Sequence, residues 1–228
     1  MPSVTLKNSP QIEARRPRRA LSFRAFLHPL LSAPRSFLLF LLPLLAALLL
    51  QLTGPGALRD LFIYDRAALS SGELWRFWTG HLCHFGWFHT LADTAVFLAA
   101  AVALTFRASS RLTLLHSLLL LPAVVSLAIY VFDPAMHRYA GLSGVNVGLL
   151  VFLSLDGFRR HRRDWFWPAL LVIHAVELFL EYRNGGLGGG AIRFDEPAIR
   201  IATIAHLAGA AYGLLWFLLP ARSPHPLS

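Results

Sequence analysis

Charged residues are scarce in this chain of 228 residues. Asp, Glu, Lys and Arg make up only 14% of it, whereas 56% of the residues are hydrophobic and the mean hydropathy is +0.55. Soluble domains contain about 25% charged and about 45–50% apolar residues. The composition therefore excludes an ordinary soluble domain and indicates a membrane protein.

Cysteine and lysine are almost absent, since each occurs once, as Cys83 and Lys7. A single cysteine excludes an intrachain disulfide and leaves the redox compartment open. The basic residues are almost all Arg and give a net charge of +9. Because they alternate with apolar runs and do not line one face, we attribute them to membrane topology and expect no nucleic-acid partner.

Six apolar runs follow one another, each near the length that crosses about 30 Å of hydrocarbon. The first is too long for a signal-peptide core and lacks a convincing cleavage site, so we expect an uncleaved span. The sequence thus predicts an all-α membrane protein, a bundle of six transmembrane helices with a short central fourth helix. The predicted runs are residues 36–52, 84–106, 112–132, 142–155, 166–180 and 197–219.

The distribution of basic residues predicts the orientation of these spans. With the N-terminus inside, the cytoplasmic segments hold fourteen of the 21 Lys and Arg residues, including the cluster at 159–163. The positive-inside rule then places both termini in the cytoplasm. We expect a basic cytoplasmic tail over 1–35, a membrane domain over 36–219 and a short cytoplasmic tail over 220–228.

The fourth run opens with Gly141-Leu142-Ser143-Gly144. A run ending near residue 155 rises only about 22 Å at 1.5 Å per residue. Its first residues would then begin about 8 Å below the outer surface. Irregular backbone at that depth is tolerated where it lines a water-filled space, so we expect Ser143 at the bottom of a cavity open to the outside.

His206 lies in another apolar helix, and a polar group at membrane depth is costly unless it meets a partner. Together, Ser143 and His206 predict a serine nucleophile with a histidine base, which requires a separation of about 2.6–3.2 Å. The N–H groups near Gly141 and Gly144 would suit an oxyanion. The alternative is that Ser143 only caps a helix.

Small residues would allow the two helices to approach closely. Gly144 and Gly148 share one face of the fourth helix, and Gly209 and Gly213 share the face of His206 in the last helix. This is the small-xxx-small pattern of membrane helix packing. Packing alone is the alternative explanation of these glycines.

His89 and Asp93 are four residues apart and therefore share a helix face at the start of the second span. Both would be intramembrane and need a partner, and an oxyanion above Ser143 is one candidate. The alternative is a satisfied pair that packs helices. His84 lies on another face of an ideal helix, so we expect it to brace a loop.

A series of motifs occurs in one order along the chain: Glu73-Leu74-Trp75-Arg76-x-x-Thr79, His84, His89, Asp93, Gly141-x-Ser143-Gly144 and His206-x-x-Gly209-x-x-x-Gly213. Together they resemble the rhomboid family of intramembrane serine proteases, over about residues 36–219. The resemblance implies a six-helix core, a Ser143–His206 dyad with no third acidic member, and cleavage at or near a transmembrane segment. It further implies His89 as an oxyanion donor and Trp75 and Arg76 in an outer loop partly in the lipid.

Asp93 departs from the family pattern, which usually has Asn as a further oxyanion donor at this place. A carboxylate facing an oxyanion would repel it. Three alternatives remain open: burial keeps Asp93 protonated, Asp93 pairs with His89 and holds that ring as imidazolium, or Asp93 has turned away.

Four further motifs are Thr79-Gly80-His81-Leu82, Gly141-Leu142-Ser143-Gly144-Val145, Glu177 and Ala205-His206-Leu207-x-Gly209-Ala210. They more narrowly resemble the rhombosortase branch, which is associated with bacterial proteins that end in a Gly-Gly motif, an apolar span and a basic tail. The resemblance implies the bacterial inner membrane as location. Glu177 would either pair with His174 or read the substrate.

Rival functions are less well supported. An inactive rhomboid-like protein that binds and escorts membrane proteins usually lacks Ser or His, and both are present here. Haem or metal ligation by histidines would leave Gly141–Gly144 unexplained, and no HExxH motif occurs. The aspartyl class needs two intramembrane aspartates, and only Asp93 lies within a span. We expect transmembrane-segment substrates and the lipid bilayer as partners, and no metal or cofactor.

Overall fold

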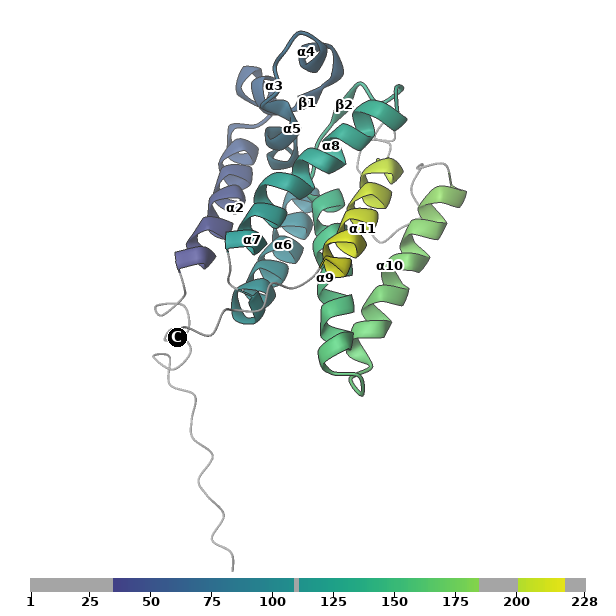
Figure 1. The fold of residues 1–228 in the computed structure, drawn as a ribbon. Coiled ribbons are helices and arrows are strands. Elements are labelled where there is room, and N and C mark those ends of the chain that lie inside the picture. Colours follow the sequence, from purple (N-terminus) through teal and green to yellow (C-terminus); the bar gives the residue numbers. More distant parts are fainter. Residues whose placement is uncertain (1–34, 109–110, 185–200, 220–228) are drawn as a thin grey trace, which may run out of the picture. The chain divides into compact units, whose positions relative to one another are not determined.

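The computed structural model describes residues 35–108, 111–184 and 201–219 (Figure 1). The chain divides into two compact units, Met1–Ala33 and Pro34–Ser228, and every described residue belongs to the second. The predicted basic tail lies outside the described residues except for Arg35, and the predicted C-terminal tail lies wholly outside them.

The described part of the chain is nearly all helical, so the all-α class is confirmed. Each long helical segment overlaps one of the predicted apolar runs, although several of the ends differ. A short antiparallel pair, β1 (Tyr64–Asp65) with β2 (Arg138–Tyr139), joins two connecting loops. The long segments are α2 (Arg35–Thr53), α6 (Trp87–Ala108), α7 (Arg111–Leu114) continued by the π-helical η2 (Leu115–Leu120) and α8 (Leu121–Phe132), α9 (Ser143–Arg160), α10 (Phe166–Arg183) and α11 (Thr203–Leu218).

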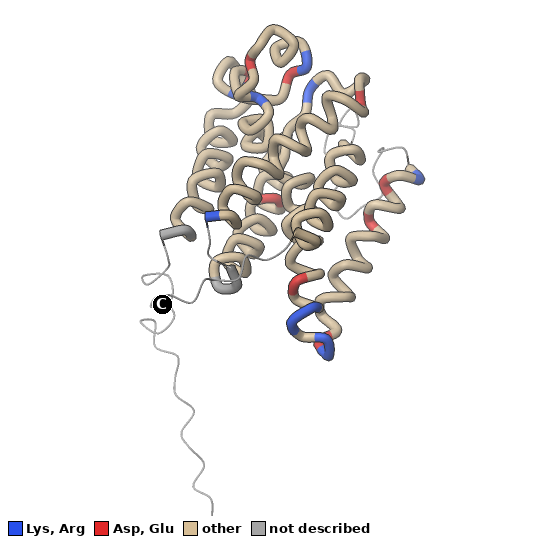
Figure 2. Tube along the Cα trace, viewed as in Figure 1, with Lys and Arg blue, Asp and Glu red and all other residues tan. Residues whose placement is uncertain are grey.

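Two of the described helical stretches, Trp87–Thr105 and Arg111–Phe132, are long and apolar enough to cross a membrane by length and composition. Phe37–Thr53 and Thr203–Leu218 are apolar but shorter. Figure 2 shows that most Lys and Arg positions of the described residues lie toward the ends of the helices, with a few acidic positions in between. Crossing by all six segments stays a prediction.

The fourth long helix, α9, is central but not short. It has 18 residues, as many as α10 and more than the 16 of α11, so the predicted end near residue 155 is wrong. The helix continues to Arg160 because the buried Asp156 accepts hydrogen bonds from Arg159 (2.7 Å) and Arg160 (2.8 Å). Its central position is clear from its contacts with α6, α8, α10 and α11 (Figure 1).

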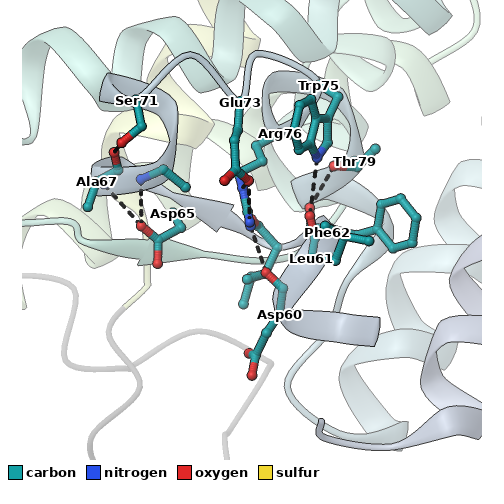
Figure 3. Close-up of polar contacts among 12 residues, drawn as sticks. Asp60, Leu61, Phe62, Asp65, Ala67, Ser71, Glu73, Trp75, Arg76 and Thr79 are labelled. Atoms are coloured by element: carbon teal, nitrogen blue, oxygen red, sulfur yellow. Dashed lines mark hydrogen bonds and ion pairs between the residues drawn. The ribbon is translucent and has the colours of Figure 1, made fainter. Parts of the chain in front are cut away.

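The segment between α2 and α6 is a folded loop held by Arg76, which is only 6% exposed. The Arg76 guanidinium donates to the carbonyl oxygens of Asp60 (2.7 Å) and Ile63 (2.6 Å) and pairs with Glu73 at 2.7 Å (Figure 3). Trp75 adds a hydrogen bond to the Leu61 carbonyl (3.2 Å). The Arg76 side chain, at the start of α5 (Arg76–Thr79), thus links α3 (Ala57–Phe62) and the residue after it to the turn before α5. The other short elements of this loop are β1, α4 (Arg66–Ser70) and η1 (Gly80–Leu82).

Replacing Arg76 with Ala should destabilise the protein. The substitution removes the donor to the buried Ile63 carbonyl oxygen and to the partly buried Asp60 carbonyl oxygen. A buried acceptor left without a donor costs about 1–3 kcal/mol. We expect the melting temperature in detergent to fall by several degrees, as measured by thermal aggregation.

Arg138→Ala is the matched control. Arg138 pairs with Asp60 and lowers the pKa of that carboxyl through a hydrogen bond, but both side chains are about half exposed. Exposed ion pairs contribute little to stability. Equal losses of stability in the two variants would contradict the central role of Arg76 in the loop.

Candidate active site

Ser143 is the first residue of α9 and follows a turn at Gly141. The φ angle of Gly141 is +125°, in the region that favours glycine, and a Cβ there would lie 2.9 Å from the His89 ring. The Gly141 carbonyl oxygen accepts a hydrogen bond from the Tyr139 hydroxyl (2.9 Å) and lies 3.1 Å from Nδ1 of His81. Burial raises the pKa of Tyr139, so its hydroxyl stays protonated and donates. These contacts fix the turn that aims Ser143.

Glycines bring the backbones of α9 and α11 into direct contact. A Cβ built on Gly209 would overlap the carbonyl oxygen of Gly144, and one on Gly213 would overlap that of Gly148. A Cβ on Gly144 would lie 2.9 Å from the Ala205 carbonyl oxygen. No larger residue fits at Gly209 or Gly213 without moving the helices apart, and His206 lies on this same part of α11.

Ser143 and His206 line one cavity. His206 is buried, and its Nε2 atom has no hydrogen-bond partner among the described residues. The structure contains no hydrogen bond between these two side chains. Nucleophile and base are often farther apart without substrate than in the reacting complex, so this geometry leaves the pairing available.

The other imidazole nitrogen of His206 has a partner that the sequence analysis did not identify. Its Nδ1 atom lies 2.7 Å from Oε2 of Glu181 on α10, and both side chains are about nine-tenths buried. The predicted fifth run ended at residue 180, which left Glu181 outside it. The sequence does contain one sign of Glu181: it is a second carboxylate, four residues after Glu177, in an apolar segment. Nothing in the sequence indicated that α10 and α11 meet at this residue.

Asp93 connects the start of α9 to two histidines. Its Oδ2 atom accepts the Leu142 N–H at 2.7 Å and lies 3.2 Å from Nε2 of both His84 and His89. The Asp93 carbonyl oxygen also accepts the Asn146 side-chain amide at 3.0 Å. Of the three alternatives for this carboxyl, the structure contains the pairing with His89, and Asp93 has not turned away.

His84 belongs to the same cluster, so the expectation that it only braces a loop is wrong. The α6 helix begins at Trp87, and ideal helical angles therefore do not apply to His84. Its ring meets the His89 ring edge to face, with centroids 5.0 Å apart. The possible ligand atoms of His84, His89 and Asp93 lie within 4.8 Å of one another, a spacing that a metal ion could use. The 3.2 Å contacts of both rings with one Asp93 carboxylate oxygen account for the same arrangement.

The cavity has a volume of about 480 Å³, within the range of small-molecule and peptide sites. Apolar side chains from α6, α9 and α10 form most of its wall. Glu177 lies there beside His174, with Oε2 and Nδ1 3.3 Å apart. Its polar lining includes His89, Asp93, Arg138, Tyr139, Ser143, Asn146, His174, Glu177, Glu181 and His206.

The candidate residues are thus distributed over three places. Ser143, His206, His89 and Asp93 meet at the cavity, and the glycines lie behind it in the turn and in the α9–α11 contact. Trp75 and Arg76 lie in the folded loop, and neither is among the residues that line the cavity.

Comparison with known families agrees with these motifs. The family model of the Rhomboid domain matches residues 71–223, about two thirds of the chain, from the loop before Trp75 to just past α11. A comparison with curated proteins finds no match.

Replacing Gly209 with Ala should separate α9 from α11, because the added methyl group overlaps a backbone carbonyl that cannot rotate away. We expect a lower melting temperature in detergent and loss of labelling by a fluorophosphonate probe. Ala211→Val is the control, since Ala211 is exposed on another face of α11. Normal stability and labelling of Gly209→Ala would refute a requirement for this contact.

Proposed function

The chain belongs to the rhomboid family, and we propose that it is an intramembrane serine endopeptidase with Ser143 as nucleophile and His206 as general base. The observation that carries this proposal is the cavity into which both side chains face, with Nε2 of His206 buried and unpartnered. A buried ring nitrogen without a partner is costly and is suited to accept a proton from a hydroxyl group.

The proposed reaction is acyl transfer. Ser143 Oγ attacks the peptide carbonyl carbon while His206 Nε2 takes the hydroxyl proton. When the tetrahedral intermediate collapses, the C–N bond breaks and His206 returns the proton to the leaving amine. Water or another nucleophile then releases the acyl group from Ser143.

The oxyanion would lie at the start of α9, where backbone N–H groups have no partner within the helix. We assign the Ser143 N–H and the His89 side chain as donors, with Gly141 and Gly144 allowing the approach. Asp93 supports this arrangement because it holds both His89 and the Leu142 N–H. In this scheme the Asp93 carboxylate contacts His89 and not the oxyanion itself, so the two negative charges are separated by the imidazole ring.

The family and the apolar helices identify an integral membrane protein. We propose the finer topology predicted from the sequence: six spans over 36–219, cytoplasmic tails over 1–35 and 220–228, and location in a bacterial inner membrane. The Arg cluster in the α9–α10 turn would then face the cytoplasm, and the folded loop around Arg76 would lie at the outer surface.

An inactive binding and escort protein is the second candidate. The missing hydrogen bond between Ser143 and His206 in this structure is the observation that favours it. Retention of both side chains at one cavity favours the protease.

Ser143→Ala and His206→Ala should each abolish labelling by a fluorophosphonate probe and cleavage of a membrane-tethered substrate, because each removes a reacting group. Melting temperatures should stay close to wild type. Ser71→Ala, at an exposed serine in the outer loop, is the control and should keep wild-type labelling. A labelled Ser143→Ala protein, or an unlabelled wild type, would exclude the protease.

For substrate class, we propose secreted proteins with a C-terminal Gly-Gly motif, an apolar span and a basic tail. Co-expression with such a protein should give removal of the tail, scored as a mass decrease, and Ser143→Ala should prevent it. A matched substrate with Gly-Gly replaced by Val-Val should resist cleavage. Cleavage of both substrates at equal rates would contradict the Gly-Gly preference.

A further inference from the structure

Glu181 is an acidic side chain buried against His206 at the rim of the cavity. It belongs to the last turn of α10, its Oε2 atom lies 2.7 Å from Nδ1 of His206, and its side chain is 9% exposed. A buried carboxylate is costly unless it is paired and hydrogen-bonded. The short contact with His206 meets that requirement.

This contact determines which nitrogen of His206 faces the nucleophile. A carboxylate that accepts this hydrogen bond takes it from a protonated Nδ1 of His206. The lone pair is then on Nε2, the atom that is buried without a partner. Nε2 is therefore the nitrogen ready to take a proton from Ser143.

We propose that Glu181 is a positioning residue that completes a Ser143–His206–Glu181 triad, an inference that rests on the proposed protease function. The carboxylate holds the imidazole in the productive tautomer and stabilises the imidazolium that forms when Ser143 loses its proton. The resemblance to rhomboids implies a dyad without an acidic member, so this chain departs from that pattern.

Other charged or titratable groups at the cavity do not replace Glu181. Glu177 and His174 on the same helix pair with each other. Asp93 on α6 is engaged by His84, His89 and the Leu142 N–H. Arg138 pairs with Asp60 outside the cavity.

The Glu181–His206 pair also connects α10 to α11, and only α11 is held against α9 by the glycine contact. His206 lies on α11, which the glycine contact fixes against α9, whereas Glu181 lies on α10. The orientation of the His206 imidazole thus depends on the position of α10 relative to α11. A side chain from α10 that is absent or too short would leave the ring free to turn.

The test measures inactivation of the full-length protein in detergent by a fluorophosphonate probe, which separates the rate constant kinact from the binding constant KI. Glu181→Gln should lower kinact by about 100-fold with KI within about twofold, because the charge is lost while the shape is kept. Glu181→Asp should recover part of the rate. Formate added to Glu181→Ala should also restore part of the rate, and should have no effect on Glu181→Ala combined with His206→Ala.

The control is Asp164→Asn, the same loss of charge at an exposed residue before the other end of α10. Wild-type kinact in Glu181→Gln would overturn the triad and leave the proposed protease intact, whereas an unlabelled wild type would overturn the protease itself. Equal losses of kinact and melting temperature in Glu181→Gln and Glu181→Asp, without formate rescue, would show a structural role and also overturn the triad.

Discussion

Direct backbone contact between α9 and α11 is the constraint on which the rest of the site depends. Gly209 lies against the carbonyl oxygen of Gly144, and Gly213 lies against that of Gly148. In a membrane, helix association is driven by close packing and not by exclusion of water, so absent side chains are what permit it. The contact places the start of α9 and the imidazole of His206 at one cavity. A single methyl group at Gly209 would change the distance between the start of α9 and the His206 imidazole.

Polar contacts hold the same site from the other direction. The loop before α6 is folded around Arg76, and Asp93 on α6 binds the Leu142 N–H at the start of α9. The Gly141 turn is held by Tyr139. Each of these buried polar groups has a partner within reach, which is the condition for irregular backbone among apolar helices. The start of α9 is thus fixed by hydrogen bonds, while the rest of the helix is fixed by its close packing against α11.

Sequence reasoning succeeded where the signal was local. Apolar runs predicted the positions of the long helices, and glycine spacing predicted which faces approach closely. It failed for the length of α9, because charged residues after 155 looked like a loop, although Asp156 pairs with the following arginines and continues the helix. It also misplaced His84, since an assumed helix start at 84 set the wrong angle relative to His89. Partners across helices, such as Glu181 and His206, could not be read from spacing.

The sequence by itself determined the membrane class and the family and singled out Ser143 and His206 as the proposed reacting pair, because composition and short-range motifs depend only on neighbouring residues. The tertiary structure decided which polar groups meet: Asp93 with two histidines, Glu181 with His206, and Ser143 with His206 at one cavity. Those pairings join residues that are distant along the chain. Their distances depend on how helices cross and rotate, which no local pattern encodes.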